Sequence, residues 1–186
     1  MRLSSVWLPN KILIYGKGGH AMVVKDLLLA NSPTWHMVFY QDGDRTDLEY
    51  WYEQGYHMGT CGVGGAMKHL VRRKVFRRLK KAGYELPTLI HPSAVVSESA
   101  IFGEGCQVLE GAIVQTGARI GDNCLINTGA IVSHDCRLGS NVHVGPGATI
   151  GGGAIIGNDC LIGMNATVFL MARINENTVV KNGENV

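Results

Sequence analysis

The second half of the chain, from His91 to Val186, repeats one pattern of apolar and polar positions every six residues. It divides into sixteen blocks of six without an insertion, and the sixth residue of every block is apolar. The fourth residue is nearly always alanine or cysteine, and the third is usually glycine, asparagine, aspartate or serine. Because side chains alternate between the two sides of a strand, the fourth and sixth residues point one way and the fifth points the other way.

This pattern predicts a short strand followed by a corner in every block. The residue types at the third position tolerate the left-handed backbone that a tight corner requires. No helix has a period of six, and a chain that alternates strand and corner at this spacing winds into a parallel β-helix. Three blocks form one triangular coil, so the sixteen blocks predict about five coils.

The first half of the chain has a different pattern. Strand-like runs cover residues 11–15 and 37–40, and a helix-forming stretch covers residues 21–30, after a turn rich in glycine at residues 16–19. A third strand and a glycine-rich loop are expected within residues 57–65, and a helix over residues 66–82 that Gly83 ends. Residues 45–58 show no clean period and receive no assignment.

These runs predict an α/β, Rossmann-like nucleotide-binding domain over residues 11–88, followed by the β-helix domain over residues 89–186, with residues 1–10 as an N-terminal extension. Glycines after the first strand let the backbone approach a ligand, and a helix N-terminus favours phosphate. The glycine cluster alone is a weak signal, because it lacks a complete dinucleotide or P-loop fingerprint. The helix over residues 66–82 is rich in arginine and lysine, and we expect these side chains to form a solvated face rather than a phosphate site.

Composition narrows the possible partners. The chain has 17 basic and 15 acidic residues, so its overall charge does not indicate a nucleic acid or a membrane surface as partner. No apolar run is long enough to insert into a membrane, and the first residues are too short and interrupted for a signal peptide, so a cytoplasmic protein is expected. Four of the five cysteines occupy the small inward position of a block, where a thiol serves as an apolar filler.

Two histidines of the repeat are candidates for chemistry. His134 lies at a corner, where an imidazole can take a proton near neutral pH, and Asp135 beside it could fix its tautomer. The spacing alone fits ordinary polar corner residues equally well. His143 is a fifth-position residue whose neighbours one coil away are Leu125 and Leu161, so it is either an interface residue or a ligand contact.

Fifth-position residues should form one stripe on each face of the prism. The three stripes are Val95, Ile113, Ile131 and Thr149; Gln107, Leu125, His143, Leu161 and Val179; and Ile101, Arg119, Arg137, Ile155 and Arg173. Two stripes are largely apolar where they should meet water, which is typical of interfaces. Three prisms packed around a threefold axis would each use two faces and leave the arginine face outside.

Specific segments resemble a known family. Residues 127–136 (NTGAIVSHDC), 141–144 (NVHV), 15–20 (YGKGGH) and 89–94 (LIHPSA) resemble the left-handed β-helix acyltransferases, in the branch of sialic-acid O-acetyltransferases and nucleotide-amino-sugar N-acetyltransferases. The resemblance implies an acetyl-CoA-dependent N-acetyltransferase that acts on a nucleotide-linked amino sugar, a 4-amino sugar, for a surface glycan. It also implies a homotrimer and no metal.

The resemblance assigns roles to individual residues. It implies that His134 is the general base and that Asp135 supports it. The residues that would bind acetyl-CoA are His143, Gly152, Gly163 and Met164. The residues that would bind the nucleotide sugar are Gly18, Gly19, His20, Gln41, Asp42 and Gly64. Because His134 and His143 lie on opposite sides of one coil, we expect that a thioester served by both histidines lies between two subunits.

The chain departs from the family pattern at two places. Gly65 stands where the family carries a polar asparagine or aspartate, and the repeat stops at Val186, where relatives continue with a tail that covers CoA. Part of the CoA site is therefore expected to be missing or supplied differently. The other functions considered are a sialic-acid-type O-acetyltransferase, a non-catalytic nucleotide-sugar-binding scaffold and a β-helix carbonic anhydrase, which needs three converging histidines.

Overall fold

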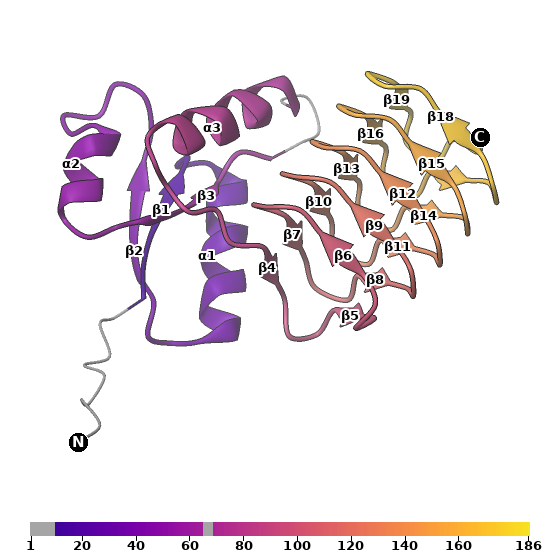
Figure 1. Ribbon diagram of the computed structural model, residues 1–186, viewed down its shortest axis with the longest axis horizontal. Helices are drawn as coiled ribbons and strands as arrows, with labels where there is room; N and C mark the ends of the chain where they lie inside the picture. Colours follow the sequence, from indigo (N-terminus) through magenta and orange to yellow (C-terminus); the bar gives the residue numbers. More distant parts are fainter. Residues whose placement is uncertain (1–9, 65–68) are drawn as a thin grey trace.

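A computed structural model describes residues 10–64 and 69–186 and consists of an N-terminal α/β region that leads into a β-helix (Figure 1). Most of the predicted N-terminal extension and the start of the helix predicted over 66–82 lie outside the described residues. The β-helix has about five turns, as the sixteen blocks predict.

The α/β region contains a three-stranded parallel sheet in the order β2-β1-β3. Its elements are β1 (Lys11–Tyr15), α1 (Gly19–Asn31), β2 (His36–Tyr40), α2 (Leu48–Glu53), β3 (Met58–Cys61) and α3 (His69–Lys81). Alternation along β1 divides the packing, because Ile12 and Ile14 contact α1, whereas Leu13 and Tyr15 contact the side of α2 and α3. Because the three strands run parallel, their carboxyl ends lie at the same edge of the sheet.

Helix α2 lies within residues 45–58, which show no clean period in the sequence. Asp47 caps this helix, because its carboxylate accepts a hydrogen bond from the Tyr50 N–H at 2.9 Å. The helix has only two turns, and its aromatic side chains contact rings outside it, such as Tyr52 against Tyr84. A helix this short shows too few turns to produce a readable period.

The β-helix has three flat faces, each a parallel sheet of two-residue strands. Face 1 contains β4 (Leu89–Ile90), β7 (Gln107–Val108), β10 (Leu125–Ile126), β13 (His143–Val144), β16 (Leu161–Ile162) and β19 (Val179–Val180). Face 2 contains β5 (Val95–Val96), β8 (Ile113–Val114), β11 (Ile131–Val132), β14 (Thr149–Ile150) and β17 (Thr167–Val168). Face 3 contains β6 (Ile101–Phe102), β9 (Arg119–Ile120), β12 (Arg137–Leu138), β15 (Ile155–Ile156) and β18 (Arg173–Ile174).

The register confirms three blocks per coil. His143 pairs with Leu125 on one side and Leu161 on the other, as the period predicts. The inward fourth and sixth positions form one apolar core, in which the four cysteines of the repeat are fully buried. Corners use glycine or a left-handed asparagine or aspartate, for example Asp135 at φ 59°. Met171, at φ 60°, is the one large apolar residue in this conformation among the described residues.

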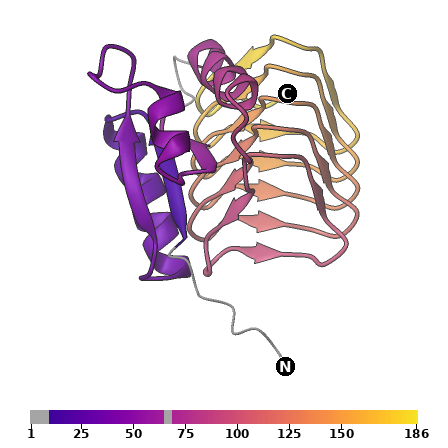
Figure 2. The ribbon, with the colours of Figure 1, turned by 60° about the vertical axis from the view of Figure 1, so that its left-hand side comes forward.

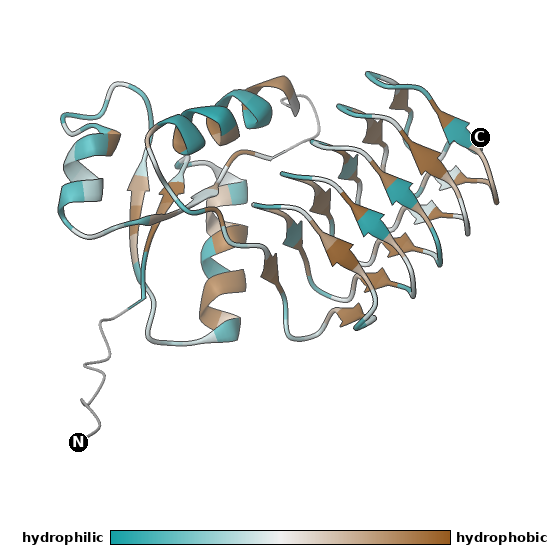
Figure 3. Cartoon of the chain, viewed as in Figure 1, coloured by the Kyte–Doolittle hydropathy of each residue, from teal (hydrophilic) through white to brown (hydrophobic). Residues whose placement is uncertain are grey.

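The α/β region packs against face 1 of its own chain (Figure 2). Gln107 is 0 % exposed, Leu125 1 % and His143 4 %. The prediction that this stripe meets water is therefore wrong over its first coils, because the same chain covers it, and only Val179 near the end of the stripe is more than half exposed. Face 2 remains open with Val95 exposed, and Figure 3 shows hydrophilic strands β9, β12 and β18 on face 3.

Candidate functional sites: a cavity and a histidine corner

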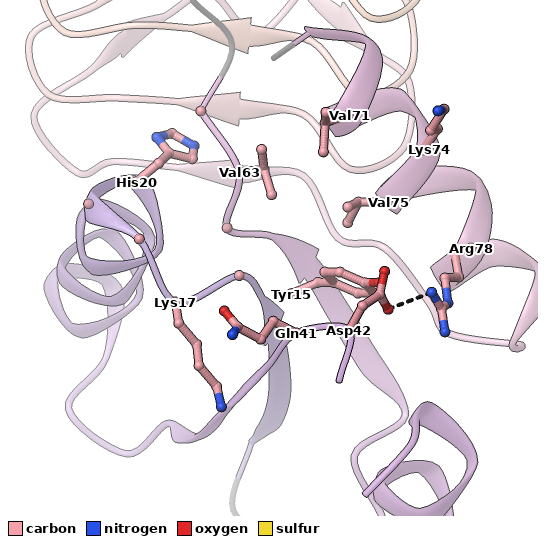
Figure 4. A pocket seen from close by; sticks show the side chains of 15 residues that line it. Tyr15, Lys17, His20, Gln41, Asp42, Val63, Val71, Lys74, Val75 and Arg78 are labelled. Carbon is pink, nitrogen blue, oxygen red and sulfur yellow. Dashed lines mark hydrogen bonds and ion pairs between the residues drawn. The ribbon is translucent and has the colours of Figure 1, made fainter. Parts of the chain in front are cut away.

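A cavity of about 850 Å³ lies at the carboxyl ends of β1, β2 and β3 (Figure 4). Ligands of open parallel sheets bind at this edge, because loops and helix N-termini converge there. All six residues that the sequence analysis assigned to the nucleotide sugar line this one cavity: Gly18, Gly19, His20, Gln41, Asp42 and Gly64. Helix α3 closes the other side with Val71, Lys74, Val75 and Arg78.

Two glycines explain how the loops come together under the cavity. Gly16 has φ +137°, and a Cβ there would lie 2.7 Å from the carbonyl oxygen of Gly62. A Cβ on Gly62 would lie 2.7 Å from the Ile14 side chain. In contrast, a Cβ on Gly18 or Gly19 would meet no atom within 4 Å. Those two glycines therefore leave space at the start of α1, where the first N–H groups have no partner within the helix.

Charged groups surround Asp42, which follows the end of β2. The Tyr15 hydroxyl donates to the Asp42 carboxylate, and Arg78 forms an ion pair with it. Burial, with Asp42 as the second cause, raises the pKa of Tyr15, so this phenol stays protonated and donates. Lys17 pairs with Asp44 at 2.7 Å. A carboxylate after the second strand is the group that commonly accepts hydrogen bonds from ribose in this architecture.

A buried polar network joins the cavity to face 1. His20 Nε2 lies 2.9 Å from Oε1 of Gln107, and Nη1 of Arg72 lies 3.1 Å from the same oxygen. Arg72 also donates to the carbonyl oxygens of Val63 and Asn123. Arg72 is only 2 % exposed, so the expectation of a uniformly solvated basic face on this helix is wrong at this residue, which donates to buried oxygens instead.

The corner between faces 2 and 3, called here the 2–3 corner, comprises residues 97–99, 115–117, 133–135, 151–153 and 169–171. It carries His134, whose Nδ1 lies 2.9 Å from the Asp135 carboxylate. Because an ionised carboxylate can only accept, Nδ1 carries the proton and Nε2 keeps its lone pair. The His134 N–H donates to the Gln115 side chain at 3.0 Å, which ties the residue to the coil before it.

Glycines make room for both side chains of this pair. A Cβ on Gly152, one coil further on, would lie 2.6 Å from Nε2 of His134, so the imidazole ring rests on the Gly152 backbone. A Cβ on Gly117 would lie 2.5 Å from the Asp135 carboxylate. The Gly152 N–H donates to none of the residues that the structure describes. The basic nitrogen of an exposed side chain therefore lies beside a backbone donor of Gly152, which is itself buried.

The remaining predicted residues lie elsewhere in the same chain. Gly163 and Met164 lie on the corner between faces 1 and 2, and the Nε2 of His143 lies 3.0 Å from the Asn127 side chain that begins an earlier turn of that corner. Face 2 separates this group from His134. The structure thus brings His134, Asp135 and Gly152 together, and it does not bring His143, Gly163 or Met164 to the same corner.

Several residues of these two sites were missed from sequence. Tyr15, Lys74 and Arg78 line the cavity but were not assigned to the ligand, although Tyr15 begins the YGKGGH segment and the other two lie in the basic helix. Gln107 had a usable signal, because it is a polar residue within an otherwise apolar stripe, as His143 is. Phe169, Leu170 and Met171 continue the 2–3 corner and are 57 %, 68 % and 69 % exposed, which makes an apolar surface next to Gly151–Gly153.

Within residues 10–64 and 69–186, no three histidine, cysteine or acidic side chains converge as a metal site would require. In the same part of the chain, no helix combines the length and the apolar character needed to cross a membrane.

Comparisons with known proteins divide the chain at the same place as the fold. Residues 11–79 match the model of the PglD N-terminal domain, and residues 117–152 and 135–169 match that of the bacterial transferase hexapeptide, six repeats. A curated UDP-N-acetylbacillosamine N-acetyltransferase of Bacillus subtilis (strain 168) is 33 % identical over 116 residues. That match covers 54 % of this chain and about half, 51 %, of the relative.

Solved structures match nearly the whole chain. PerB from Caulobacter crescentus, in complex with CoA and GDP-perosamine, is 36 % identical with a TM-score of 0.87, over 95 % of this chain and 88 % of PerB. The acetyltransferase domain of PglB from Neisseria gonorrhoeae FA1090, in complex with acetyl-CoA, is 30 % identical with a TM-score of 0.84, over 95 % of this chain and 92 % of that domain.

Proposed function

Because this chain belongs to the left-handed β-helix family of nucleotide-sugar N-acetyltransferases, we propose that it transfers the acetyl group of acetyl-CoA to the amino group of a nucleotide-linked amino sugar. The observation that carries the proposal is the pairing of His134 with Asp135, with the His134 ring against the Gly152 backbone. We further infer that the sugar is a 4-amino sugar of a surface glycan, as the sequence resemblance implies. Among the relatives, one is named for UDP-N-acetylbacillosamine and another is solved with GDP-perosamine.

The corner supplies the proton transfer that amide formation needs. A sugar amine attacks the thioester carbonyl carbon, and Nε2 of His134 accepts the proton that the nitrogen loses. The carbonyl oxygen becomes negatively charged as the new C–N bond forms, and the Gly152 N–H is suited to stabilise it. The C–S bond then breaks, and the CoA thiolate can recover a proton from the imidazolium. Asp135 holds Nδ1 protonated throughout and so keeps Nε2 as the basic atom.

The apolar surface of Phe169, Leu170 and Met171 suits the pantetheine arm of acetyl-CoA. Exposed apolar side chains beside a reactive group commonly mark a ligand or partner surface. The Met171 side chain lies over Gly153, which is one coil from His134. With the thioester at His134, the pantetheine arm would therefore extend along this surface. Acetyl-CoA is thus the proposed co-substrate, with no metal in the reaction.

The cavity is the proposed site of the nucleotide. Backbone N–H groups at the start of α1 suit the diphosphate, and the Asp42 carboxylate suits a hydroxyl of the ribose. Lys74 and Arg78 add positive charge at the wall that α3 forms. The roles proposed for Gly18, Gly19, Gln41 and Gly64 follow from their position around this cavity.

We also propose that the complete site forms between subunits of a homotrimer. The cavity is lined by residues of the α/β region, which covers face 1, whereas His134 lies on the opposite corner of the prism. A nucleotide sugar held in one subunit would therefore present its amine to His134 of a neighbour. His143 on face 1, with Gly163 and Met164 on the corner between faces 1 and 2, would then contribute from a subunit other than the one that supplies His134.

Two experiments test this proposal. A panel of UDP-, dTDP- and GDP-linked amino sugars with acetyl-CoA, followed by free-thiol detection, should give turnover with at least one compound, and turnover with sialic acids alone would contradict N-acetylation. For the shared site, we expect that refolding inactive His134→Ala with inactive Asp42→Ala restores part of the activity in mixed trimers. Mixed trimers without recovered activity would show that each site lies within one chain.

A further inference from the structure

Gln107 connects the β-helix to the cavity through both ends of its side-chain amide. It is 0 % exposed on β7 of face 1. Its Nε2 donates to the Thr60 hydroxyl and to the Cys61 carbonyl oxygen, both at 2.9 Å. Its Oε1 lies 3.1 Å from Nη1 of Arg72 and 2.9 Å from Nε2 of His20. A single β-helix residue thus contacts β3, α3 and α1, three of the elements that surround the cavity.

The partners of Gln107 allow only one orientation of its amide. A backbone carbonyl can only accept, so the amide NH₂ must face Cys61. A guanidinium can only donate, so the amide oxygen must face Arg72. The same oxygen faces His20, and therefore Nε2 of His20 must carry the proton of that hydrogen bond. A neutral imidazole has one N–H, which leaves Nδ1 of His20 with a lone pair.

The surroundings of His20 keep its ring neutral. The pKa of His20 is lowered to about 4, mainly by burial and secondly by the positive charge of Arg72. The hydrogen bond with Gln107 is a smaller effect and raises the pKa. Nδ1 of His20 makes no hydrogen bond to any described residue. It is also not one of the polar atoms that are buried without a partner, so it must contact solvent. His20 itself lines the cavity (Figure 4).

We propose that Gln107 is a positioning residue that holds His20 as the Nε2–H tautomer, so that Nδ1 accepts a hydrogen bond from a hydroxyl or N–H of the nucleotide sugar. The nature of this ligand rests on the proposed function. A phosphate is excluded from this position, because phosphate oxygens are acceptors and would face the lone pair of Nδ1. The segment that begins α1 would therefore recognise two different parts of the ligand. Its backbone N–H groups suit the diphosphate, and the His20 side chain suits a hydroxyl.

The tautomer can be measured without any ligand. Long-range ¹H–¹⁵N spectra of the ring distinguish a protonated from an unprotonated nitrogen, and we expect a protonated Nε2 and a bare Nδ1 in the full chain from pH 8 to pH 5. In Gln107→Glu, a carboxylate replaces the neutral acceptor between His20 and Arg72, so the pKa of His20 should rise and both ring nitrogens should be protonated at neutral pH. In Gln107→Met, which keeps a similar volume, the two tautomers should mix.

Thr60→Val is the matched control. It removes one of the two groups that receive the Gln107 NH₂, whereas Cys61 and Arg72 still fix the amide, so the His20 tautomer should not change. Each variant is compared by circular dichroism to confirm that it folds. A wild-type His20 that carries its proton on Nδ1, or a Gln107→Met spectrum identical to the wild type, would overturn the proposal.

Binding measurements test what Nδ1 recognises. Calorimetry would compare UDP-, dTDP- and GDP-linked 4-amino sugars with UDP, dTDP and GDP alone. In Gln107→Glu at pH 7, affinity for the nucleotide or sugar part that donates to Nδ1 should fall about 3- to 10-fold, the usual effect of one hydrogen bond. At pH 9 the ring should be neutral again and the loss should shrink, whereas Thr60→Val should show neither effect.

The two proposals fail in different ways. If no compound of the panel binds wild-type protein, the proposed function is wrong, while the spectra still decide whether Gln107 sets the tautomer. If the wild type binds and Gln107→Glu weakens every compound equally at pH 7 and pH 9, the nucleotide site is supported and the role of His20 as an acceptor is overturned.

Discussion

The cavity and the 2–3 corner each contain one histidine, and in each case one ring nitrogen is already occupied. At the corner, Asp135 engages Nδ1 of His134, whose side chain is 55 % exposed. In the cavity, Gln107 engages Nε2 of His20, and burial keeps the ring neutral. A carboxylate stabilises an imidazolium, whereas an amide beside a buried arginine does not. The same side chain is therefore prepared as a base at the corner and as a hydrogen-bond acceptor in the cavity.

Removing the base should have the largest effect on catalysis. We expect His134→Ala to lower kcat by about two to four orders of magnitude, the usual contribution of a positioned general base. Stopped thiol-release assays at saturating acetyl-CoA would measure the change. His91→Ala, at another corner of the repeat, is the control and should keep normal turnover. Near-normal turnover of His134→Ala across pH would contradict the role of this residue as the base.

Crowding the corner should have the next largest effect. The Cβ of Gly152→Ala would lie 2.6 Å from Nε2 of His134 and must displace the ring, although the backbone at this glycine does not require a positive φ. A displacement of about 1 Å at a reacting group can cost about 100-fold in rate, so we expect a loss of that order in kcat. Thermal unfolding should change little by comparison. A variant with full activity would show that the ring position over Gly152 is not the reactive one.

Changing the carboxylate should have a smaller effect than either. Asp135 adopts φ 59°, a conformation that asparagine also tolerates, so Asp135→Asn should fold normally. Its side chain is 71 % exposed, and exposed ion pairs contribute up to about 1 kcal/mol, so we expect kcat to fall by up to about 5-fold. The same thiol-release assay would measure the change. An unchanged kcat would mean that Asp135 does not hold His134 in its reactive tautomer.

The period of six was enough to predict the β-helix domain. Alternation and corner chemistry predicted the β-helix coils, the inward cysteines and the register of His143, because every coil repeats the same local constraints. The covering of face 1 was not predictable in this way. Leu125 is a fifth-position residue like Ile131, and nothing local distinguishes a stripe buried by the chain's own α/β region from one left open.

The candidate sites show the same difference between what local sequence displays and what tertiary contacts determine. Gly18, Gly19 and His20 lie in one short contiguous segment, as the His134–Asp135 pair does in another, and a sequence displays such segments directly. Gln41, Asp42 and Gly64 lie outside these segments and were implied only by the family resemblance. Gln107 and Arg72 are distant in sequence from His20, and their effect on it depends on a tertiary contact between two halves of the chain. For that reason the protonation state of His20, rather than its location, is what the structure adds.

The contrast between the two histidines also predicts how stability depends on pH. His20 has a pKa of about 4 in the folded chain, below its ordinary value of 6.5. Below pH 6.5 the unfolded chain takes up a proton that the folded chain refuses, so this residue's contribution is complete above pH 6.5 and is lost as pH falls towards 4. A shift of this size corresponds to a loss of up to about 3 kcal/mol in unfolding free energy. In His20→Gln, the amide nitrogen can still donate to Gln107 but does not titrate. We therefore expect urea unfolding of the wild type to show a steeper fall between pH 6.5 and pH 4 than that of His20→Gln, with the two curves parallel above pH 7. Equal slopes for the wild type and His20→Gln would show that His20 is not held neutral.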